Sequence, residues 1–228
     1  MRSRTRSWSF VAVVVVLVAT VGYLRGAGQQ TVPFQNGIPV APLGLSGRPL
    51  PALPVVIDTA EGMRVRVSVV ARGLENPWSI AFLPDGAMLV TERAGRLRII
   101  RNGVLDPQPV AGGPMAYGAG VSGLPGAVHG YMDVTLHPKF AQNRLIYLSY
   151  TKARGVKQPI GAIARGRWDG KGLVDMKEIF VTGEGEASAM RLAFGRDDTL
   201  YVTTTGATPQ DPNTLAGKVL RLADDGSI

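Results

Sequence analysis

The chain has 228 residues, of which 45% are hydrophobic and 18% charged, with 29 Gly, 16 Pro and no Cys. This composition is typical of a globular chain of one or two domains with many turns, and it excludes collagen-like and disordered chains. The lack of Cys excludes disulfides, thiolate nucleophiles, zinc ribbons and iron–sulfur sites. The formal net charge of +8 falls to +4 without Arg2, Arg4, Arg6 and Arg25, which all precede the first acidic residue, Asp58. The rest of the chain mixes both signs without a basic run, so we expect no nucleic-acid partner.

The first 28 residues have the features of a targeting segment. Three arginines within the first six residues are followed by an apolar run at 10–22, as in a secretory signal peptide. The nearly uncharged stretch 8–24 has 17 residues, the lower limit for crossing a bilayer, so an uncleaved membrane anchor is the alternative. We therefore expect residues 1–28 to be a signal peptide or N-terminal anchor, and the protein to be periplasmic or secreted.

The next segment, 29–62, is rich in proline. Six prolines and a single charge, Arg48, lie between residues 29 and 54, without helical or strand periodicity. Such a composition is typical of an extended linker. The alternative is an irregular first segment that wraps around the surface of its own domain.

From residue 63 onward, short apolar alternations bounded by turns predict β-strands rather than helices. Residues 80–91 match residues 192–203 position for position in polarity, and 134–150 form a looser third copy with a longer turn. Each copy reads as a strand, a turn and a second strand. A period of just over 50 residues that contains several strands is typical of blade-forming repeats, and it predicts an all-β fold, the β-propeller.

Three repeats are too few to close a propeller ring, which has typically four to eight blades. We therefore expect residues 63–228 to be a partial β-propeller, about the first three blades of a longer protein. The alternative, an open three-blade domain, would leave two sheet faces and two strand edges exposed. The two matching copies continue alike at 95–100 and 217–222, but ten extra residues precede the second continuation. A long loop on a rigid frame is a common place for a functional site.

Four segments, at 73–86, 89–97, 132–140 and 210–222, resemble the soluble PQQ-dependent aldose dehydrogenases, the glucose/sorbosone dehydrogenase family of six-bladed propellers. The resemblance implies PQQ and calcium as cofactors, an aldose sugar as substrate and an external electron acceptor. It also implies a catalytic His that removes the proton of the sugar C1 hydroxyl while hydride passes to the quinone.

Two family motifs depart from the expected pattern. The family's base lies in a His-Phe-Gly-Gly-Arg-Leu segment, but residues 187–192 read Ala-Ser-Ala-Met-Arg-Leu, so Ala187 stands at the His position. The family's Gln-Gly-Gly-Leu-Leu-Asp-Val motif corresponds to 128–134, where Val128 replaces the Gln and His129 follows it. We hypothesise that His129 is a relocated catalytic base; the alternative is a structural or solvent-exposed histidine.

Further candidates for the site each have a structural alternative. Arg191 matches the family's Arg and would bind cofactor carboxylates with its guanidinium, unless it is an ordinary surface residue. Gln210, Asp211 and Asn213 would bind the cofactor or sugar hydroxyls, unless they only form a turn. His137, which precedes a proline, is expected in a turn or packing role. The sequence assigns no metal ligand.

The predicted function is therefore PQQ-dependent oxidation of an aldose at C1, with electron transfer to an external acceptor. The alternative is a propeller that has lost its catalytic base and binds a carbohydrate or a protein. Val128 and Ala187 favour this alternative, because neither side chain can accept a proton. The acidic pair Glu184 and Glu186 beside Ala187 could supply a substitute base or could belong to a solvated loop.

Overall fold

The structure is a computed structural model in which the chain divides into two compact units, residues 1–55 and 56–228. In the first unit, strands β1 (Phe34–Gln35) and β2 (Ile38–Pro39) pair antiparallel. No helix among the residues placed by the structure is long and apolar enough to cross a membrane. The segment 1–28 lies outside these residues, so its role as a signal peptide or anchor stays a prediction. Beyond the two short strands, the structure describes residues 53–117, 129–154, 158–183, 190–206 and 208–228.

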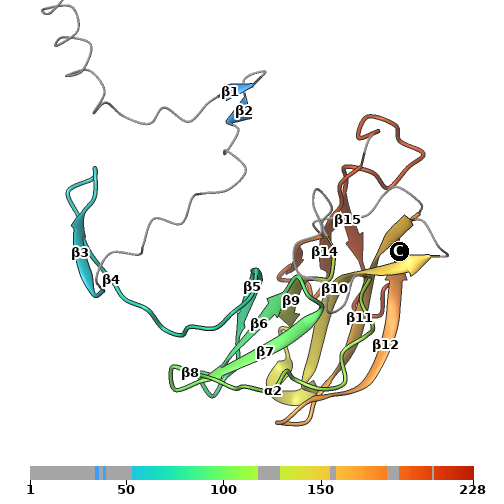
Figure 1. The fold of residues 1–228 in the computed structure, drawn as a ribbon. Coiled ribbons are helices and arrows are strands. Elements are labelled where there is room, and N and C mark those ends of the chain that lie inside the picture. Colours follow the sequence, from blue (N-terminus) through green and yellow to red (C-terminus); the bar gives the residue numbers. More distant parts are fainter. Residues whose placement is uncertain are drawn as a thin grey trace, which may run out of the picture. The chain divides into compact units, whose positions relative to one another are not determined.

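Three antiparallel sheets follow one another along the second unit (Figure 1). In each sheet the strands are hydrogen-bonded in their order along the chain. The first sheet consists of β5 (Pro77–Phe82), β6 (Met88–Glu92), β7 (Arg96–Arg101) and β8 (Val104–Leu105). The second consists of β9 (Tyr131–Leu136), β10 (Leu145–Arg154), β11 (Gln158–Trp168) and β12 (Leu173–Val181). The third consists of β13 (Leu192–Phe194), β14 (Leu200–Thr203) and β15 (Val219–Leu222).

This succession of two four-stranded sheets and one three-stranded sheet confirms the predicted propeller architecture. The three sequence copies coincide with the first hairpin of each sheet, β5–β6, β9–β10 and β13–β14. The longer turn of the second copy holds the one-turn helix α2 (Phe140–Asn143). A separate hairpin, β3 (Val55–Asp58) with β4 (Arg64–Val67), precedes the first sheet along the chain.

In the first and third sheets, an aspartate closes the turn that joins the first two strands. In the β5–β6 turn, the Asp85 carboxylate accepts the Ala87 N–H at 3.0 Å, and Gly86 has φ 83°. In the β13–β14 turn, the Asp197 carboxylate accepts the Thr199 N–H at 3.3 Å, and Asp198 takes the left-handed position. A short side-chain acceptor followed by a residue with positive φ closes such turns locally, so these aspartates have structural roles.

Strands β9 and β10 of the second sheet are buried on both faces, because this sheet lies between the other two. Ile146 and Leu148 of β10 point into one apolar cluster with Leu89 and Leu97 of the first sheet. Tyr147, on the opposite face of the same strand, points into a second cluster with residues of the third sheet. The alternation of side chains along a strand thus supplies two cores from one strand.

The two flanking sheets keep an exposed outer side. On β5, Ile80 and Phe82 are 49% and 66% exposed, and Val219 on β15 is 69% exposed. These apolar residues are exposed because no further sheet covers these sides among the residues that the structure describes. In a closed ring, each sheet would bury such residues against the next.

The first strands of the three sheets lie side by side, since β9 contacts both β5 and β13. A hydrogen bond from the Thr91 hydroxyl of β6 to the Met132 carbonyl of β9, 2.6 Å long, joins the first two sheets at this place. The three first strands, β5, β9 and β13, therefore lie next to one another. The loops at each end of these strands are close together in space.

Candidate functional site

The loops fall into two groups, one at each end of the sheets. Because neighbouring strands are antiparallel, the end at which the first strand of each sheet begins also holds the turn between the second and third strands. We call this end the leading end; it includes Arg93, His129, Arg191 and the loop 204–218. A Cβ on Gly130 would lie 1.7 Å from the Arg93 carbonyl oxygen, so the β6–β7 turn touches the start of β9. All five sequence-predicted site residues belong to the leading end.

His129 lies two residues before β9 and is fully buried. The next residue, Gly130, donates its N–H to the Thr151 hydroxyl at 2.8 Å, which fixes the backbone here. A general base must come within hydrogen-bond reach of the hydroxyl that it deprotonates. His129 exposes no surface for such a contact in this conformation, so its role as the base stays a hypothesis that requires local movement.

Arg191 immediately precedes β13, and its side chain is 57% exposed. Its Nη1 lies 3.5 Å from an Asp133 carboxylate oxygen, and its backbone N–H donates to the Thr203 hydroxyl at 3.0 Å. A guanidinium that is anchored on one side and accessible on the other can bind a ligand carboxylate. This geometry suits the predicted role of Arg191.

Gln210, Asp211 and Asn213 lie together in the loop between β14 and β15. Asp211 accepts hydrogen bonds from the backbone N–H and the side-chain amide of Asn213, at 2.9 and 3.2 Å. The Asp211 carboxylate is therefore engaged in the turn, as the structural alternative predicted, whereas Gln210 and Asn213 remain exposed to solvent. Binding of a ligand by these side chains stays a prediction.

Two residues that the sequence did not single out hold this loop in place. The Thr204 hydroxyl donates to the Leu215 carbonyl and accepts the Lys218 N–H at 2.9 Å. The Lys218 ammonium donates to the carbonyls of Pro209 and Ala216, at 2.8 and 2.7 Å. The long loop is thus pinned at its base by its own polar side chains.

Asp133 is the buried charge that sequence reasoning treated only as part of a matching segment. It lies in the middle of β9, is 6% exposed, and accepts the Leu192 N–H at 2.8 Å. A signal was present in the sequence, because a lone carboxylate within an apolar strand must find partners when it is buried. The identity of those partners depends on strands that are far away along the chain.

Tyr131, at the start of β9, is unsuited to act as a base. Burial raises the pKa of Tyr131 to about 12, and its hydroxyl donates to the Pro114 carbonyl at 2.6 Å. The phenol therefore stays protonated at neutral pH and serves as a hydrogen-bond donor.

The described residues fit part of a site for an anionic cofactor. Arg191 offers a guanidinium for a carboxylate, and the loop that contains Gln210 and Asn213 offers exposed amide groups at the same end of the sheets. Among the described residues, no three His, Asp or Glu side chains are grouped so that they could hold a metal ion, so no calcium ligand is assigned. Val128, Ala187, Glu184 and Glu186 lie outside the described residues.

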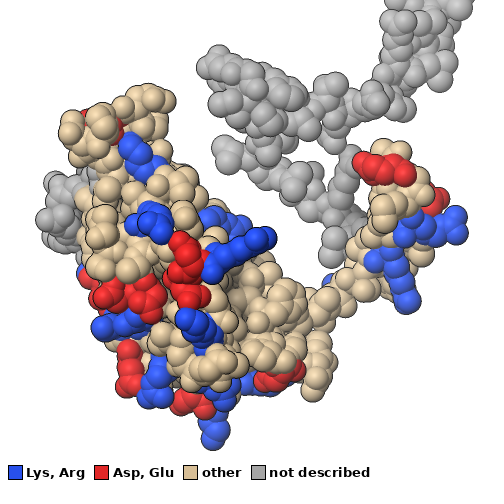
Figure 2. All heavy atoms as spheres, turned by 180° about the vertical axis from the view of Figure 1, so that it is seen from behind, with Lys and Arg blue, Asp and Glu red and all other residues tan. Residues whose placement is uncertain are grey.

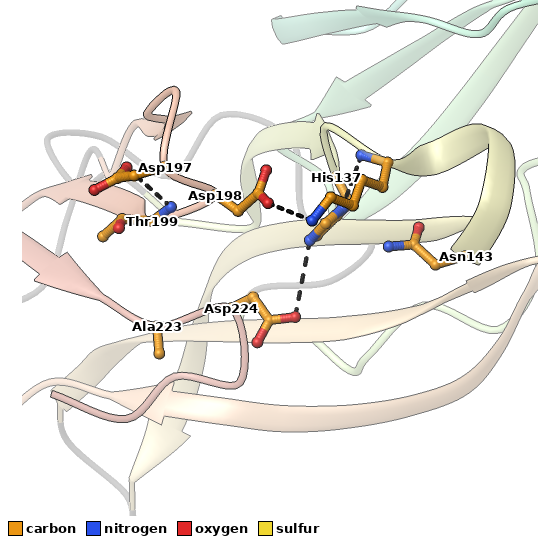
Figure 3. Close-up of a pocket in the computed structure, with 8 residues that line it drawn as sticks. His137, Asn143, Asp197, Asp198, Thr199, Ala223 and Asp224 are labelled. Carbon is orange, nitrogen blue, oxygen red and sulfur yellow. Dashed lines mark hydrogen bonds and ion pairs between the residues drawn. The ribbon is translucent and has the colours of Figure 1, made fainter.

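The opposite end of the sheets carries a hollow of about 470 Å³ between the second and third sheets (Figure 3). Three of its charged groups, Lys139, Asp198 and Asp224, are paired across the two sheets. Lys139 lies 2.6 Å from the Asp198 carboxylate, and Arg165 lies 3.4 Å from that of Asp224. The Tyr147 hydroxyl also donates to the Asp224 carbonyl at 2.9 Å. These contacts identify the hollow as a junction between sheets. It is lined by His137, Lys139, Asn143, Asp197, Asp198, Thr199, Ala223 and Asp224.

His137 has the turn and packing role that its sequence context predicted. Its Nδ1 accepts the Lys139 N–H at 2.9 Å, and its ring lies against those of Tyr147 and Phe194. Its Nε2 lies 3.8 Å from an Asp224 carboxylate oxygen. The imidazole thus packs between the second and third sheets.

We expect the stability of the protein to fall as the pH is lowered through about 6.5, the pKa of a free histidine. Burial lowers the pKa of His137, an effect that the carboxylates of Asp224 and Asp198 oppose and that Lys139 and Arg165 reinforce. The unfolded chain therefore takes up a proton at a higher pH than the folded protein, and the loss levels off below the folded pKa. Urea unfolding between pH 8 and pH 5 measures this slope. His137→Asn, which keeps an acceptor near the Nδ1 position, should reduce the slope; an unchanged slope would contradict the assignment.

Basic and acidic side chains are interspersed over the face shown in Figure 2. Elsewhere among the described residues, Lys152 and Glu178 form an ion pair at 2.8 Å. The charge on this face is therefore mixed in sign, as the sequence predicted for residues 58–228.

Comparison with known families gives a match to the glucose/sorbosone dehydrogenase model over residues 74–228. Among curated proteins, the chain is 35% identical over 198 residues to the uncharacterized protein slr1608 of Synechocystis. It is 34% identical over 175 residues to the aldose sugar dehydrogenase YliI of Escherichia coli. These alignments cover 78% and 72% of this chain but 48% and 45% of the relatives, so the chain spans about half of their length.

Solved structures likewise show similarity to sugar dehydrogenases over about half of their length. The apo form of the soluble aldose sugar dehydrogenase from Escherichia coli superposes with a TM-score of 0.62 and 31% identity, over 71% of this chain and 48% of that one. The PQQ-bound aldose sugar dehydrogenase from Streptomyces coelicolor has a TM-score of 0.58 and 28% identity, over 70% and 48%. The sheets described above are thus similar to one half of these enzymes.

Proposed function

Because the chain belongs to the glucose/sorbosone dehydrogenase family, we propose that it forms part of a PQQ-dependent enzyme that oxidises an aldose at C1 and passes the electrons to an external acceptor. Two relatives support the proposal by their names, an aldose sugar dehydrogenase from Escherichia coli and a PQQ-bound one from Streptomyces coelicolor. The observation in this chain that carries it most directly is the exposed guanidinium of Arg191 at the leading end.

Arg191 would hold a carboxylate of PQQ, and the exposed amides of Gln210 and Asn213 would bind sugar hydroxyls or the cofactor. When bound, PQQ accepts the hydride from the sugar carbon. The proton of the C1 hydroxyl needs a separate acceptor, for which His129 is the candidate. Calcium would accompany PQQ, through ligands that we do not assign.

A second candidate function is a propeller that binds a carbohydrate or a protein without turnover. Two features favour it: Ala187 stands at the family's His position, and the replacement imidazole, His129, is fully buried. The two candidate functions share the same propeller fold. They differ in whether a catalytic base reaches the sugar.

Reconstitution of the full-length protein with PQQ and calcium separates the two functions. We expect PQQ-dependent reduction of a dye with at least one of a panel of aldoses, and a large loss of turnover in His129→Ala. His137→Asn, at the opposite end of the sheets, is the matched control and should keep its turnover. Binding of PQQ without turnover on any aldose would favour the binding module. Absence of PQQ binding would overturn the enzyme.

We also propose that residues 1–28 direct export, so that the propeller acts in the periplasm or outside the cell. Mass spectrometry of the mature N-terminus tests this directly. Loss of the first 28 or so residues indicates a cleaved signal, whereas an intact N-terminus in the membrane fraction indicates an anchor.

A further inference from the structure

A single carboxylate joins the first strands of all three sheets. Asp133 lies on β9, and its Oδ1 accepts the hydroxyl of Ser79 on β5 and the N–H of Val134 at 3.0 Å. Its Oδ2 accepts the N–H of Leu192 on β13 at 2.8 Å, and Arg191 lies 3.5 Å from Oδ1. A buried carboxylate is stable only when such partners replace water. The site of this charge is thus the point at which the three sheets meet.

The chain that enters β13 is held to the second sheet at consecutive residues. The Ser149 hydroxyl accepts the Asp133 N–H at 2.8 Å and donates to the Met190 carbonyl at 2.8 Å. The next two residues, Arg191 and Leu192, both contact the Asp133 carboxylate. Residues 190–192 are therefore fixed by one aspartate and the serine bonded to it, both of which belong to a different sheet.

We propose that Asp133 is the positioning residue of the leading end: it fixes Arg191 and the start of β13 so that the guanidinium is presented to a ligand carboxylate. The ligand part of the proposal rests on the proposed function. Asp133 is buried and acts through Arg191, which is 57% exposed. In metal sites, removal of an outer residue that orients a binding residue typically weakens affinity by about 10- to 100-fold.

The structural arm of the test is amide hydrogen exchange in the full-length protein without ligand. In Asp133→Asn, an amide nitrogen can replace the Oδ2 that accepts the Leu192 N–H, while the side-chain size is kept. We expect Leu192 exchange to accelerate at least about tenfold more than that of Ile146, a core amide of β10 that reports overall stability. In Ser79→Ala, which leaves the contacts to Leu192 and Arg191 in place, the ratio of the two rates should change less than about threefold.

The ligand arm uses PQQ as the probe. We expect Asp133→Asn and Arg191→Gln each to weaken PQQ binding by about tenfold or more, as for loss of a charge-assisted hydrogen bond. If Asp133 acts through Arg191, adding Asp133→Asn to Arg191→Gln changes the affinity by less than about threefold. Because Arg191 is exposed, Arg191→Gln should fold even if Asp133→Asn does not. In that case full PQQ affinity in Arg191→Gln overturns the proposal.

The outcomes distinguish failure of the positioning role of Asp133 from failure of the proposed PQQ-dependent function. Equal acceleration of Leu192 and Ile146 in Asp133→Asn would overturn the positioning role, and so would additive losses of affinity in the double variant. If the wild-type protein binds no PQQ, the proposed function fails. The exchange ratio then decides alone whether Asp133 positions the start of β13.

Discussion

Glu92→Ala should destabilise the protein by about 3–5 kcal/mol, because it removes the carboxylate of a buried ion pair. Glu92 is fully buried at the end of β6. Its Oε1 accepts the Glu75 N–H at 2.7 Å, and its Oε2 accepts the Nε–H of Arg96 at 2.6 Å. Arg98, whose side chain is 9% exposed, lies 3.3 Å from Oε1 and would be left without this carboxylate. Urea unfolding at neutral pH measures the loss.

Glu75→Ala is the matched control for this prediction. The Glu75 side chain is 56% exposed and binds the same Arg96, at 2.6 Å. An exposed ion pair of this kind contributes up to about 1 kcal/mol, so the control should lose little stability. Similar losses in the two variants would show that burial of Glu92 is not what makes its charge important.

Gly130→Ala should cost about 3 kcal/mol or more, since it adds a steric clash to an unfavourable backbone conformation. Gly130 has φ 84°, and a Cβ there would lie 1.7 Å from the Arg93 carbonyl oxygen. The start of β9 or the β6–β7 turn must move to make room. Because His129, the candidate base, is the preceding residue, we also expect the PQQ-reconstituted variant to have a lower turnover than the wild type.

Gly86→Ala separates the cost of the steric clash from the cost of the unfavourable backbone conformation. Gly86 has nearly the same φ, 83°, but no heavy atom within 4 Å of the added Cβ. Its cost should be about 1–2 kcal/mol, the penalty for a left-handed residue alone. Thermal or urea unfolding of both variants gives the difference. Equal losses would mean that the contact between Arg93 and Gly130 does not constrain the leading end.

The sheets could be predicted from the sequence because the patterns that specify strands and turns lie within short segments of the chain. Each copy of the repeat carries its own strand periodicity and its own turn, as at Asp85 and Asp197, and these were found where expected. The period of the repeat then implied that neighbouring units stack. The double-sided burial of β10 follows from the same pattern, since consecutive residues such as Tyr147 and Leu148, which face opposite sides of the strand, are both apolar.

The candidate site could be predicted only in part, because its geometry depends on residues that are distant along the chain. Asp133 binds Ser79 and Leu192, which precede and follow it by more than 50 residues. No local pattern indicates such pairing. The sequence left open whether His129 is structural or exposed to solvent, and no local pattern indicates that its side chain is fully buried.

The proposed site at the leading end is tested most directly by a crystal structure of the full-length protein, crystallised with PQQ and calcium. We expect a planar ligand at the leading end, where β5, β9 and β13 begin, with one of its carboxylates on Arg191. A ligand in the hollow beside His137, at the opposite end of the sheets, would contradict this proposal.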